Sequence, residues 1–467
     1  MITIPDMARR KIGVFGLGLT GIATCEALVA SGAEVFAFDE SAPARAKTLN
    51  TRFAAEHPKA WPWRDLSALV VSPGVPLTHP EPHVMVRKAR KERVEVIGDI
   101  ELFARAVNAC APVGRPRVIA ITGSNGKSTT TALIGHILKD LGRVVHVGGN
   151  IGLPALSLPE LAPGSTYVLE LSSFQLDLAS SLRANTAIVL NFSPDHIDRH
   201  GDMAGYVAAK RRIFLNQQAE DCAIVGVDDV HAQTVCAALS TEGARKVMPI
   251  SSEGALGRGV FALAGKLFYA QADKNGEAGD ISRVATLQGS HNWQNAAAAL
   301  AAAIEEGIAP SVAVKAMERY PGLPHRMEIV ARKGDVLFVN DSKATNADAA
   351  MRALKSYDRV YWIAGGKAKE GGVSTLRPFM NRVARCYLVG DAAKEFEAQL
   401  AGAVDCVQCG DLQTATARAA ADAAERGGVV LLSPACASYD QFRNFEERGD
   451  TFRKLAQSIS ISNGAAA

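Results

Sequence analysis

The chain has 467 residues, of which 48% are hydrophobic and 21% are charged. A chain of this length suits about three domains, and its composition is typical of a folded protein rather than a disordered one. The 51 Lys and Arg residues nearly balance the 48 Asp and Glu residues, which gives a net charge of +3. A dedicated nucleic-acid binder needs a larger basic excess, so we expect no nucleic-acid partner.

The sequence also carries no sign of a membrane segment or a disulfide framework. No stretch approaches the roughly 20 apolar residues of a membrane span, and the N-terminal stretch MITIPDMARRKIGVFG lacks the apolar core of a signal peptide. The eight cysteines are scattered, and only Cys406 and Cys409 have CxxC spacing, without a second ligand pair nearby. We therefore expect a cytoplasmic protein with reduced thiols and no membrane partner.

The first hundred residues alternate between strand and helix patterns. Apolar strands are predicted at 11–15, 34–38 and 68–71, with a helix at 21–31. This rhythm favours a parallel, doubly wound sheet. The charged run 86–93 (VRKARKER) lacks interleaved aromatic residues, so we interpret it as the solvated face of a helix.

Two Pro- and Gly-rich stretches, 108–117 and 320–324, are candidate linkers between further α/β units. Between them, strands are predicted at 117–122, 167–171 and 186–191, and helices at 128–141 and 292–306. After the second linker, strands are predicted at 336–339, 360–364, 385–389 and 429–433.

The strongest motif is TGSNGKST at 122–129, between a buried strand and a helix. Backbone N–H groups of such a turn and of the helix N-terminus attract phosphate oxygens. Lys127 would reach the β- and γ-phosphates, and the Ser128 hydroxyl would bind Mg²⁺. The strict consensus has glycine where this chain has Ile121, so the motif is a shorter variant of the phosphate loop.

A second glycine motif, GLGLTG at 16–21, follows the first strand, and Asp39 ends the next strand. This spacing is typical of dinucleotide-binding sites. A glycine loop at a helix N-terminus binds any diphosphate, however. Nicotinamide binding, binding of another nucleotide diphosphate and a purely structural turn therefore all stay open.

Several polar residues of the central third are candidate ligands. Glu170 lies near the carboxyl end of a strand, where a carboxylate can hold Mg²⁺ beside a phosphate loop. His196 and His200 have the spacing of zinc ligands on a helix, but Pro194 and the missing glutamate of HExxH oppose zinc, and a structural role stays open for each histidine. Residue type alone predicts that Lys210 is a surface lysine.

Three polar loops follow strands in the last third, at 340–346, 365–369 and 433–440. Open α/β sheets bind ligands at the carboxyl ends of their strands. Ordinary turn chemistry stays open for each loop, but three of them on one domain favour a binding site.

Together these segments resemble the Mur ligases, the ATP-dependent amino-acid ligases of bacterial peptidoglycan precursor synthesis. The motifs that carry the resemblance are GSNGKST (123–129), GGNIG (148–152), LELSSFQL (169–176), DHIDRH (195–200), HNWQNA (291–296), LPHR (323–326), NDSKATN (340–346) and LLSPACASYDQFRNFEERG (431–449). The resemblance implies an α/β fold of three domains. These are a Rossmann-like nucleotide-sugar domain (1–98), a central P-loop ATPase-type domain with a mostly parallel sheet (99–322) and a Rossmann-like amino-acid domain (323–467).

The resemblance also implies residue roles. ATP would be held by Gly123, Ser124, Asn125, Gly126, Lys127, Ser128, Thr129, Asn295, Arg326 and Asp341. Mg²⁺, at two sites, would be held by Ser128, Glu170, His196 and a carbamylated Lys210, with Lys127, His196 and Lys210 as catalytic residues. The nucleotide-sugar would contact Leu19, Thr20, Asp39, Ser72, Gly74 and Asn150, and the amino acid would contact Thr345, Lys369, Ser438 and Phe445. Glu40-Ser41 stands where family members often carry Thr-Arg.

Within the family, GLGLTG, SPG (72–74), GDIELF (98–103) and the SPACAS block (433–438) favour a glutamate-adding activity. The implied reaction adds D-glutamate to UDP-N-acetylmuramoyl-L-alanine through an acyl phosphate. The alternatives are a related ligase for L-glutamate or another amino acid, a folate-type ligase, an NAD-dependent oxidoreductase, and a non-catalytic nucleotide-switch or nucleic-acid-associated protein. We expect a monomer that acts on small molecules.

Overall fold

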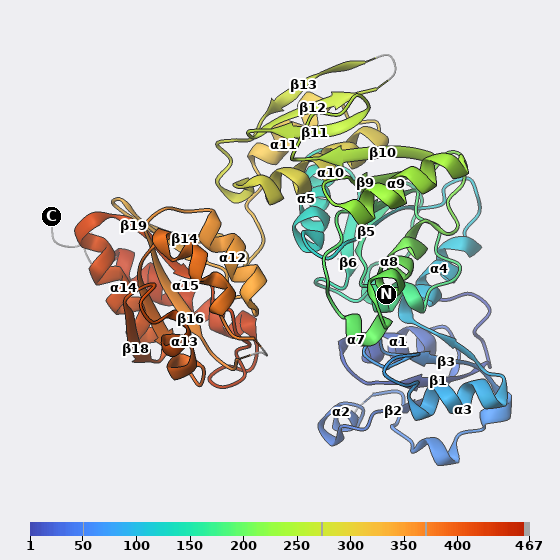
Figure 1. The fold of residues 1–467 in the computed structure, drawn as a ribbon. Coiled ribbons are helices and arrows are strands. Elements are labelled where there is room, and N and C mark those ends of the chain that lie inside the picture. Colours follow the sequence, from blue (N-terminus) through green and yellow to red (C-terminus); the bar gives the residue numbers. More distant parts are fainter. Residues whose placement is uncertain (50, 272–273, 369–370, 462–467) are drawn as a thin grey trace. The chain divides into compact units, whose positions relative to one another are not determined.

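The structure is a computed structural model of residues 1–467, and it describes all of them except 50, 272–273, 369–370 and 462–467. The predicted ligand Lys369 therefore lies outside the described residues. The chain divides into two compact units, residues 1–284 with 290–320, and residues 285–289 with 321–467. In each unit helices pack on a sheet (Figure 1), and each unit has a hydrophobic core of its own.

The first unit begins with a four-stranded parallel sheet in the order β2-β1-β3-β4. Its strands are β1 Lys11–Phe15, β2 Glu34–Phe38, β3 Leu66–Val71 and β4 Glu95–Ile97. The helices of this part are α1 Leu19–Ala30, α2 Ala42–Ala46, α3 Val84–Glu92 and α4 Asp99–Ala109. Strands β1 and β2 have the predicted bounds because each is a short apolar run bounded by turn residues.

The same unit contains a nine-stranded sheet in the order β13-β12-β11-β10-β9-β8-β5-β7-β6. Its strands are β5 Arg117–Thr122, β6 Val145–Gly149, β7 Thr166–Glu170, β8 Thr186–Val189, β9 Cys222–Gly226, β10 Lys246–Ser251, β11 Gly259–Leu263, β12 Lys266–Ala270 and β13 Asn275–Asp280. Strands β12 and β13 are antiparallel to their neighbours, and the remaining pairs are parallel. The predicted mostly parallel sheet is thus confirmed.

Helices cover this sheet and separate its strands along the chain. They are α5 Lys127–Asp140, α6 Ser173–Asp177, α7 Ile197–His200, α8 Met203–Arg211, α9 Val230–Glu242, α10 Ser290–Glu305 and α11 Pro310–Glu318. Helix α10 packs against α5, and the alanines from Ala296 to Ala303 are buried. Small side chains on α10 allow the two backbones to approach closely.

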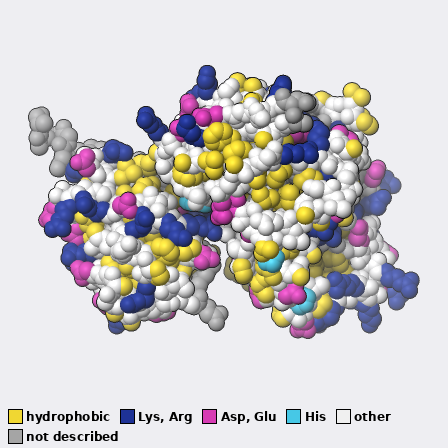
Figure 2. Space-filling model, turned by 45° about the horizontal axis from the view of Figure 1, so that its top comes forward, with side chains coloured by type: hydrophobic (Ala, Val, Ile, Leu, Met, Phe, Trp, Pro, Cys, Tyr) yellow, Lys and Arg dark blue, Asp and Glu magenta, His cyan; other side chains and the backbone are white. Residues whose placement is uncertain are grey.

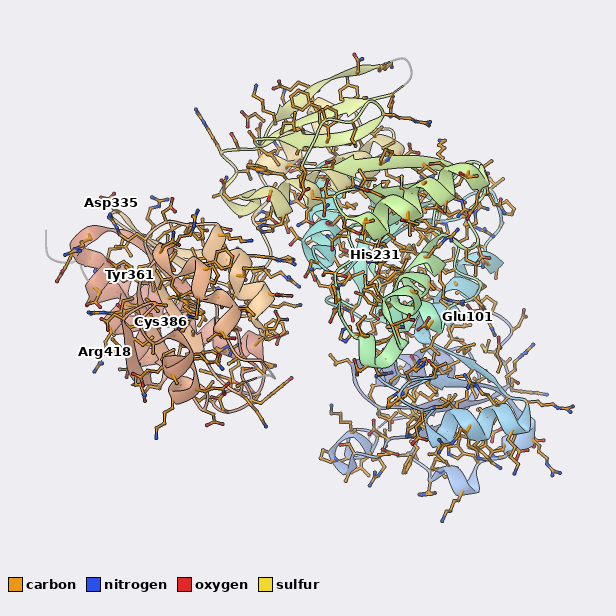
Figure 3. All side chains as sticks on the ribbon, viewed as in Figure 1. Glu101, His231, Asp335, Tyr361, Cys386 and Arg418 are labelled. Carbon is orange, nitrogen blue, oxygen red and sulfur yellow. The ribbon has the colours of Figure 1, made fainter. Side chains whose placement is uncertain are left out.

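One continuous core joins the two sheets of the first unit. It includes Leu28 of α1, Phe103 of α4 and Leu169 of β7. Helix α4 is also tied to the central part by Glu101, whose Oε2 accepts hydrogen bonds from the backbone of Ser180 at 2.7 Å and Ser181 at 2.9 Å (Figure 3). The N-terminal and central parts of the first unit therefore pack directly against each other. The predicted boundary after residue 98 stays a prediction.

The second unit is a six-stranded sheet in the order β14-β15-β19-β16-β17-β18, parallel except for the β14–β15 pair. Its strands are β14 Glu328–Lys333, β15 Val336–Asn340, β16 Val360–Gly365, β17 Val383–Val389, β18 Cys406–Gly410 and β19 Gly428–Leu432. Its helices are α12 Ala347–Lys355, α13 Ala393–Leu400, α14 Leu412–Arg426 and α15 Phe445–Ile461. Successive residues of β16 enter cores on opposite faces, Trp362 in one and Ile363 in the other.

The surface agrees with the balanced composition. On the face shown in Figure 2, Lys and Arg side chains are interspersed with Asp and Glu side chains. The predicted solvated run lies on α3, where Arg87 pairs with Glu81 and Lys88 pairs with Glu92. No helix in the described part of the chain combines the length and the apolar composition needed to cross a bilayer.

The two cysteines with CxxC spacing do not face each other. They lie three residues apart on β18, where neighbouring side chains alternate between faces. Cys406 packs against one core of the C-terminal unit and Cys409 against the other. Both are free thiols, as is Cys386 inside the sheet (Figure 3).

Candidate active site

The glycine-rich loop between β5 and α5 has a conformation that depends on glycine. Gly126 is the N-cap residue of α5 and has a φ of 85°, in the left-handed region that favours glycine. A Cβ at this position would lie 2.2 Å from Asn295 Oδ1. The loop backbone can therefore lie directly against the amide of Asn295, one of the predicted ATP contacts.

Lys127 folds back over this loop. Its Nζ donates hydrogen bonds to the carbonyl oxygens of Gly123 and Ser124, both at 2.9 Å. The following Ser128 is buried in the first turn of α5. The ammonium group, the hydroxyl and the helix N-terminus thus converge where the sequence predicts a bound phosphate.

A chain of side chains that sequence analysis missed holds this loop in place. Asn191 Oδ1 accepts from the backbone N–H of Asn125 at 3.0 Å, and Asn191 Nδ2 donates to Gln294 Oε1 at 2.9 Å. Gln294 Nε2 in turn donates to Asp228 Oδ2 at 2.8 Å. Gln294 lies within the HNWQNA motif and Asn191 ends a strand predicted from the sequence, but their contact could not be inferred without the fold.

Lys210 is buried, and the surface position that its residue type predicts is wrong. It lies on the face of α8 that packs inward with Tyr206 and Ala209, and its exposed fraction is 2%. Its Nζ donates to Gly123 O at 2.9 Å and lies 4.7 Å from the centre of the Tyr206 ring. Desolvation, with the nearby charge of Lys127, lowers the pKa of Lys210 well below its ordinary value.

Glu170, at the carboxyl end of β7, presents an unsatisfied buried oxygen. Its Oε1 accepts from Asn150 Nδ2 at 2.8 Å, whereas Oε2 is buried with no hydrogen-bond partner among the described residues. A buried carboxylate oxygen without a partner is costly, and a cation would satisfy it. The donor set of Glu170 and Ser128 oxygens suits Mg²⁺, which prefers hard oxygen ligands.

The two histidines of DHIDRH have different environments. His196 is exposed and has a φ of 53°, which is unusual for a bulky residue. The His200 ring is buried, forms a 2.9 Å hydrogen bond with Ser173 Oγ and lies 3.5 Å from Asp177 Oδ2. Burial lowers the pKa of His200 to about 4. Because His200 is engaged in these contacts, the structure favours a structural role for it.

A metal site built from protein side chains alone is not evident. Across the part of the chain that the structure describes, no three His, Cys, Asp or Glu side chains are grouped closely enough to hold a metal ion. A cation beside Glu170 would therefore need oxygen ligands of another kind, such as the Ser128 hydroxyl, a phosphate or a modified Lys210.

Five of the six predicted nucleotide-sugar residues lie at the carboxyl ends of β1, β2 and β3, whereas the sixth, Asn150, follows β6 and contacts Glu170. Ser72 Oγ donates to Gly16 O at 3.1 Å. Both carboxylate oxygens of Asp39 accept backbone hydrogen bonds, from Leu17 at 2.6 Å and Ser41 at 2.7 Å. Asp39 thus shapes the glycine loop. Leu19, Thr20 and Gly74 lie on the rim of the same loops, and Leu19 is 80% exposed.

The C-terminal unit brings together its own set of predicted residues. Asp341 follows β15 and accepts from Met327 N at 3.2 Å and from Ser433 Oγ at 2.8 Å. Burial raises the pKa of Asp341 to about 7, and the charge of Arg326 opposes that rise. Asp341 lies beside Arg326 in the fold, since it accepts from the backbone of the residue that follows Arg326.

Two loops and a helix of this unit are joined by one buried arginine that sequence analysis did not single out. Arg448 of α15 donates to Ser342 Oγ at 3.0 Å, to Ser342 O at 2.8 Å and to Cys436 O at 3.1 Å. Ser342 Oγ donates to Phe445 O at 2.8 Å. The segments carrying the predicted amino-acid contacts Thr345, Ser438 and Phe445 thus meet at Arg448.

Comparison with known proteins identifies the class. Three family models match in order: the MurD-like N-terminal domain at residues 10–98, the Mur ligase middle domain at 121–303 and the Mur ligase glutamate ligase domain at 325–436. The chain belongs to the Mur ligase family. The resemblance inferred from the motifs is confirmed, and so is the predicted α/β fold of three domains.

Individual relatives are similar over the full length. The chain is 52% identical to the UDP-N-acetylmuramoylalanine–D-glutamate ligase of Caulobacter vibrioides and 50% identical to that of Phenylobacterium zucineum, in each case over 100% of both chains. Among solved structures, UDP-N-acetylmuramate–alanine ligase from Thermotoga maritima shares the fold, with a TM-score of 0.59 and 17% identity over 96% of this chain and 99% of that one.

Proposed function

We propose that this protein is an ATP-dependent ligase that joins D-glutamate to UDP-N-acetylmuramoyl-L-alanine in peptidoglycan precursor synthesis. The observation that carries the proposal is the placement of the buried Lys210 against the phosphate loop, with an unsatisfied Glu170 oxygen on the adjacent strand β7. The full-length relatives, named for this reaction, supply the identity of the substrates.

In the proposed reaction, the substrate carboxylate takes the γ-phosphoryl group of ATP to form an acyl phosphate, and the amine of D-glutamate then displaces phosphate. A carboxylate is a poor electrophile, so its phosphorylation makes amide formation feasible at neutral pH. The ammonium of Lys127 and the backbone N–H groups at the start of α5 stabilise the charge that spreads over the transferring phosphoryl oxygens.

Mg²⁺, when bound, neutralises phosphate charge and polarises the phosphoryl group. Glu170 and Ser128 supply oxygen ligands for it, and His196 supplies a nitrogen ligand. Asn150 orients the Glu170 carboxylate through their 2.8 Å hydrogen bond. We infer two Mg²⁺ sites, the second of which uses a carbamate on Lys210.

Carbamylation of Lys210 requires a neutral amine. The nitrogen lone pair attacks the carbon of CO₂, the N–C bond forms and one proton leaves, which converts the neutral amine into an anionic oxygen donor. Burial favours the neutral amine because it lowers the pKa of Lys210. The unmodified side chain already contacts Thr122 Oγ1 at 3.3 Å beside the loop, so the carbamate would form within the nucleotide site.

ATP and the amino acid are held by further residues in this proposal. Asn295, which lies against the glycine loop, Arg326 and Asp341 are the further nucleotide contacts of this proposal. Thr345, Ser438 and Phe445 position the amino acid, together with Lys369. Ser438 is buried, which suits a specific hydrogen bond more than a solvated contact.

The test is phosphate release by the full chain with ATP, Mg²⁺ and UDP-N-acetylmuramoyl-L-alanine, supplied with D-glutamate, L-glutamate or other amino acids. We expect release only with D-glutamate, accompanied by a product whose mass equals both substrates less one water. Equal rates with L-glutamate, or no release at all, would refute the proposal. NADH titration tests the oxidoreductase alternative, in which the phosphate loop has no role.

The expected monomer, the cytoplasmic location and the domain boundaries at 98/99 and 322/323 are part of the same proposal. Light scattering on a size-exclusion column measures the oligomeric state directly. A dimer would contradict it without affecting the proposed reaction.

A further inference from the structure

The short helix α7 connects two sites that the proposed function assigns to different ligands. Its Arg199 donates from Nη1 to the carbonyl oxygen of Gly74 at 2.9 Å. Gly74 belongs to the loop after β3 in the N-terminal part, whereas α7 belongs to the central part. Arg199 is thus a direct polar contact between the nucleotide-sugar loop and the segment that carries His196.

The aromatic ring of Phe174 is the platform on which α7 rests. The guanidinium carbon of Arg199 lies 4.7 Å from the centre of this ring. The His196 ring lies 4.9 Å from it, and the His200 ring stacks on it at 5.4 Å with 15° between the planes. Arg199, His196 and His200 therefore all pack on the Phe174 ring, so a displacement of Arg199 changes the packing of His196.

The other end of the connection is the loop that starts at Ser72. Ser72 Oγ donates to Gly16 O at 3.1 Å, which joins this loop to the glycine motif after β1. Beyond Gly74, the ring of His79 reaches the residue that ends α7, since a Cβ on Gly201 would lie 3.0 Å from His79 Nε2. The loop thus contacts α7 at two points.

The local backbone makes α7 responsive to these contacts. A single helical turn of 4 residues has little stability of its own, so its position depends on its neighbours. His196, at its N-cap, has a φ of 53°, and such a conformation persists only where the surroundings impose it.

We propose that Arg199 is a positioning residue that couples occupancy of the nucleotide-sugar loop to the position of His196. The inference rests on the proposed function, which makes Ser72–Gly74 part of a substrate site and His196 a metal ligand. Binding that fixes the Ser72–Gly74 loop also fixes Arg199, and through the Phe174 platform it holds His196 in place for the metal. By linkage, the metal then tightens binding of the nucleotide-sugar by the same factor.

The experiment measures binding, not turnover, on the full chain. UDP-N-acetylmuramoyl-L-alanine is titrated calorimetrically with and without Mn²⁺ and a non-hydrolysable ATP analogue, and Mn²⁺ binding is followed by electron paramagnetic resonance with and without the nucleotide-sugar. In the wild type we expect each ligand to tighten the other at least about fivefold. We call the affinity for one ligand with the other present, divided by the affinity without it, the coupling ratio. In Arg199→Ala this ratio should be close to one.

Two further variants separate coupling from structural damage. Arg199→Lys keeps a donor for Gly74 O but loses the planar contact with Phe174, so we expect partial coupling and a normal fold. Arg245→Ala is the matched control, because Arg245 also donates to a backbone carbonyl, that of Phe214 at 2.8 Å, but makes no contact with α7 in the described hydrogen bonds and ion pairs. Its coupling ratio should equal that of the wild type.

The outcomes are distinct. A wild-type chain that binds no nucleotide-sugar refutes the proposed function itself. A wild-type chain that binds both ligands without mutual tightening overturns the inference alone. So does an Arg199→Ala variant that keeps the wild-type ratio or weakens each ligand equally under both conditions. Loss of the ratio in Arg245→Ala would show that general destabilisation is the cause, which also overturns it.

Discussion

Replacing Gly126 by alanine perturbs the phosphate loop at its most crowded point. The added Cβ would lie 2.2 Å from Asn295 Oδ1 and 3.1 Å from Leu190 Cδ1. Asn295 cannot simply withdraw, because its Oδ1 accepts from Thr130 Oγ1 at 3.2 Å and its Nδ2 donates to Asn292 Oδ1 at 3.1 Å. The native loop and the native Asn295 position are therefore incompatible with the new side chain.

The expected loss of ATP affinity in Gly126→Ala follows from these contacts. Left-handed backbone costs a residue with a Cβ about 1 kcal/mol or slightly more, and loss of the two Asn295 hydrogen bonds costs about 1 kcal/mol each. Regaining the binding-competent loop would thus cost about 3 kcal/mol, which corresponds to a loss of roughly a hundredfold in ATP affinity.

Gly142, just beyond the other end of α5, offers a matched control. It has a φ of 73°, close to that of Gly126, but an added Cβ would meet no atom within 4 Å. Gly142→Ala should therefore cost about 1 kcal/mol of stability and leave ATP binding unchanged. Titration with a fluorescent ATP analogue and thermal denaturation measure the two effects. Wild-type affinity in Gly126→Ala, or equal losses in both variants, would refute the steric argument.

Three further predictions concern charged residues. Lys127→Ala should lower turnover by about a hundredfold or more while the affinity for the nucleotide-sugar is retained; product formation at the wild-type rate would exclude the role of Lys127. Activity should depend on dissolved CO₂, and mass spectrometry of the intact chain should show one added CO₂ that is absent from Lys210→Ala; an active wild-type enzyme with unmodified Lys210 would count against the carbamate. Burial raises the pKa of Asp341 to about 7, whereas an unfolded Asp titrates near pH ~4, so the native state holds a proton that the unfolded state releases. The free energy of unfolding should therefore fall by up to about 4 kcal/mol as the pH rises from ~4 to about 7. Calorimetry should show a smaller fall in Asp341→Asn, and the same pH dependence in both chains would contradict this.

The sequence predicted most of the elements that position the site. Strands β1 and β2 and the loop before α5 were predictable because short apolar runs followed by glycine turns leave few alternatives. Strands β10 to β13 were not predicted. They lie far from any glycine motif, and an exposed antiparallel pair such as β12–β13, with a pattern like Asn275–Asp280, has no continuous apolar face.

The site residues were predicted from motifs, and a motif does not show what surrounds a side chain in the folded protein. Lys210 illustrates the limit, because lysine is usually exposed and only the fold brings Thr122 and Gly123 against it. The support of the phosphate loop by Gln294 and Asp228 is similar, since one hydrogen bond between an amide and a carboxylate joins residues 66 apart in the sequence. Such contacts follow from tertiary packing and leave no local pattern.

Arg448 has a consequence for how the amino-acid site responds to motion. It is 2% exposed and its hydrogen bonds go to hydroxyl and carbonyl oxygens of the Ser342 and Cys436 segments. Because one guanidinium donates to both segments and sits on α15 itself, none of the three can shift without breaking bonds to a buried charge, which is costly. The Thr345 and Ser438 loops and the first turn of α15 at Phe445 are therefore held as one rigid body, so that the proposed amino-acid contacts keep their mutual geometry.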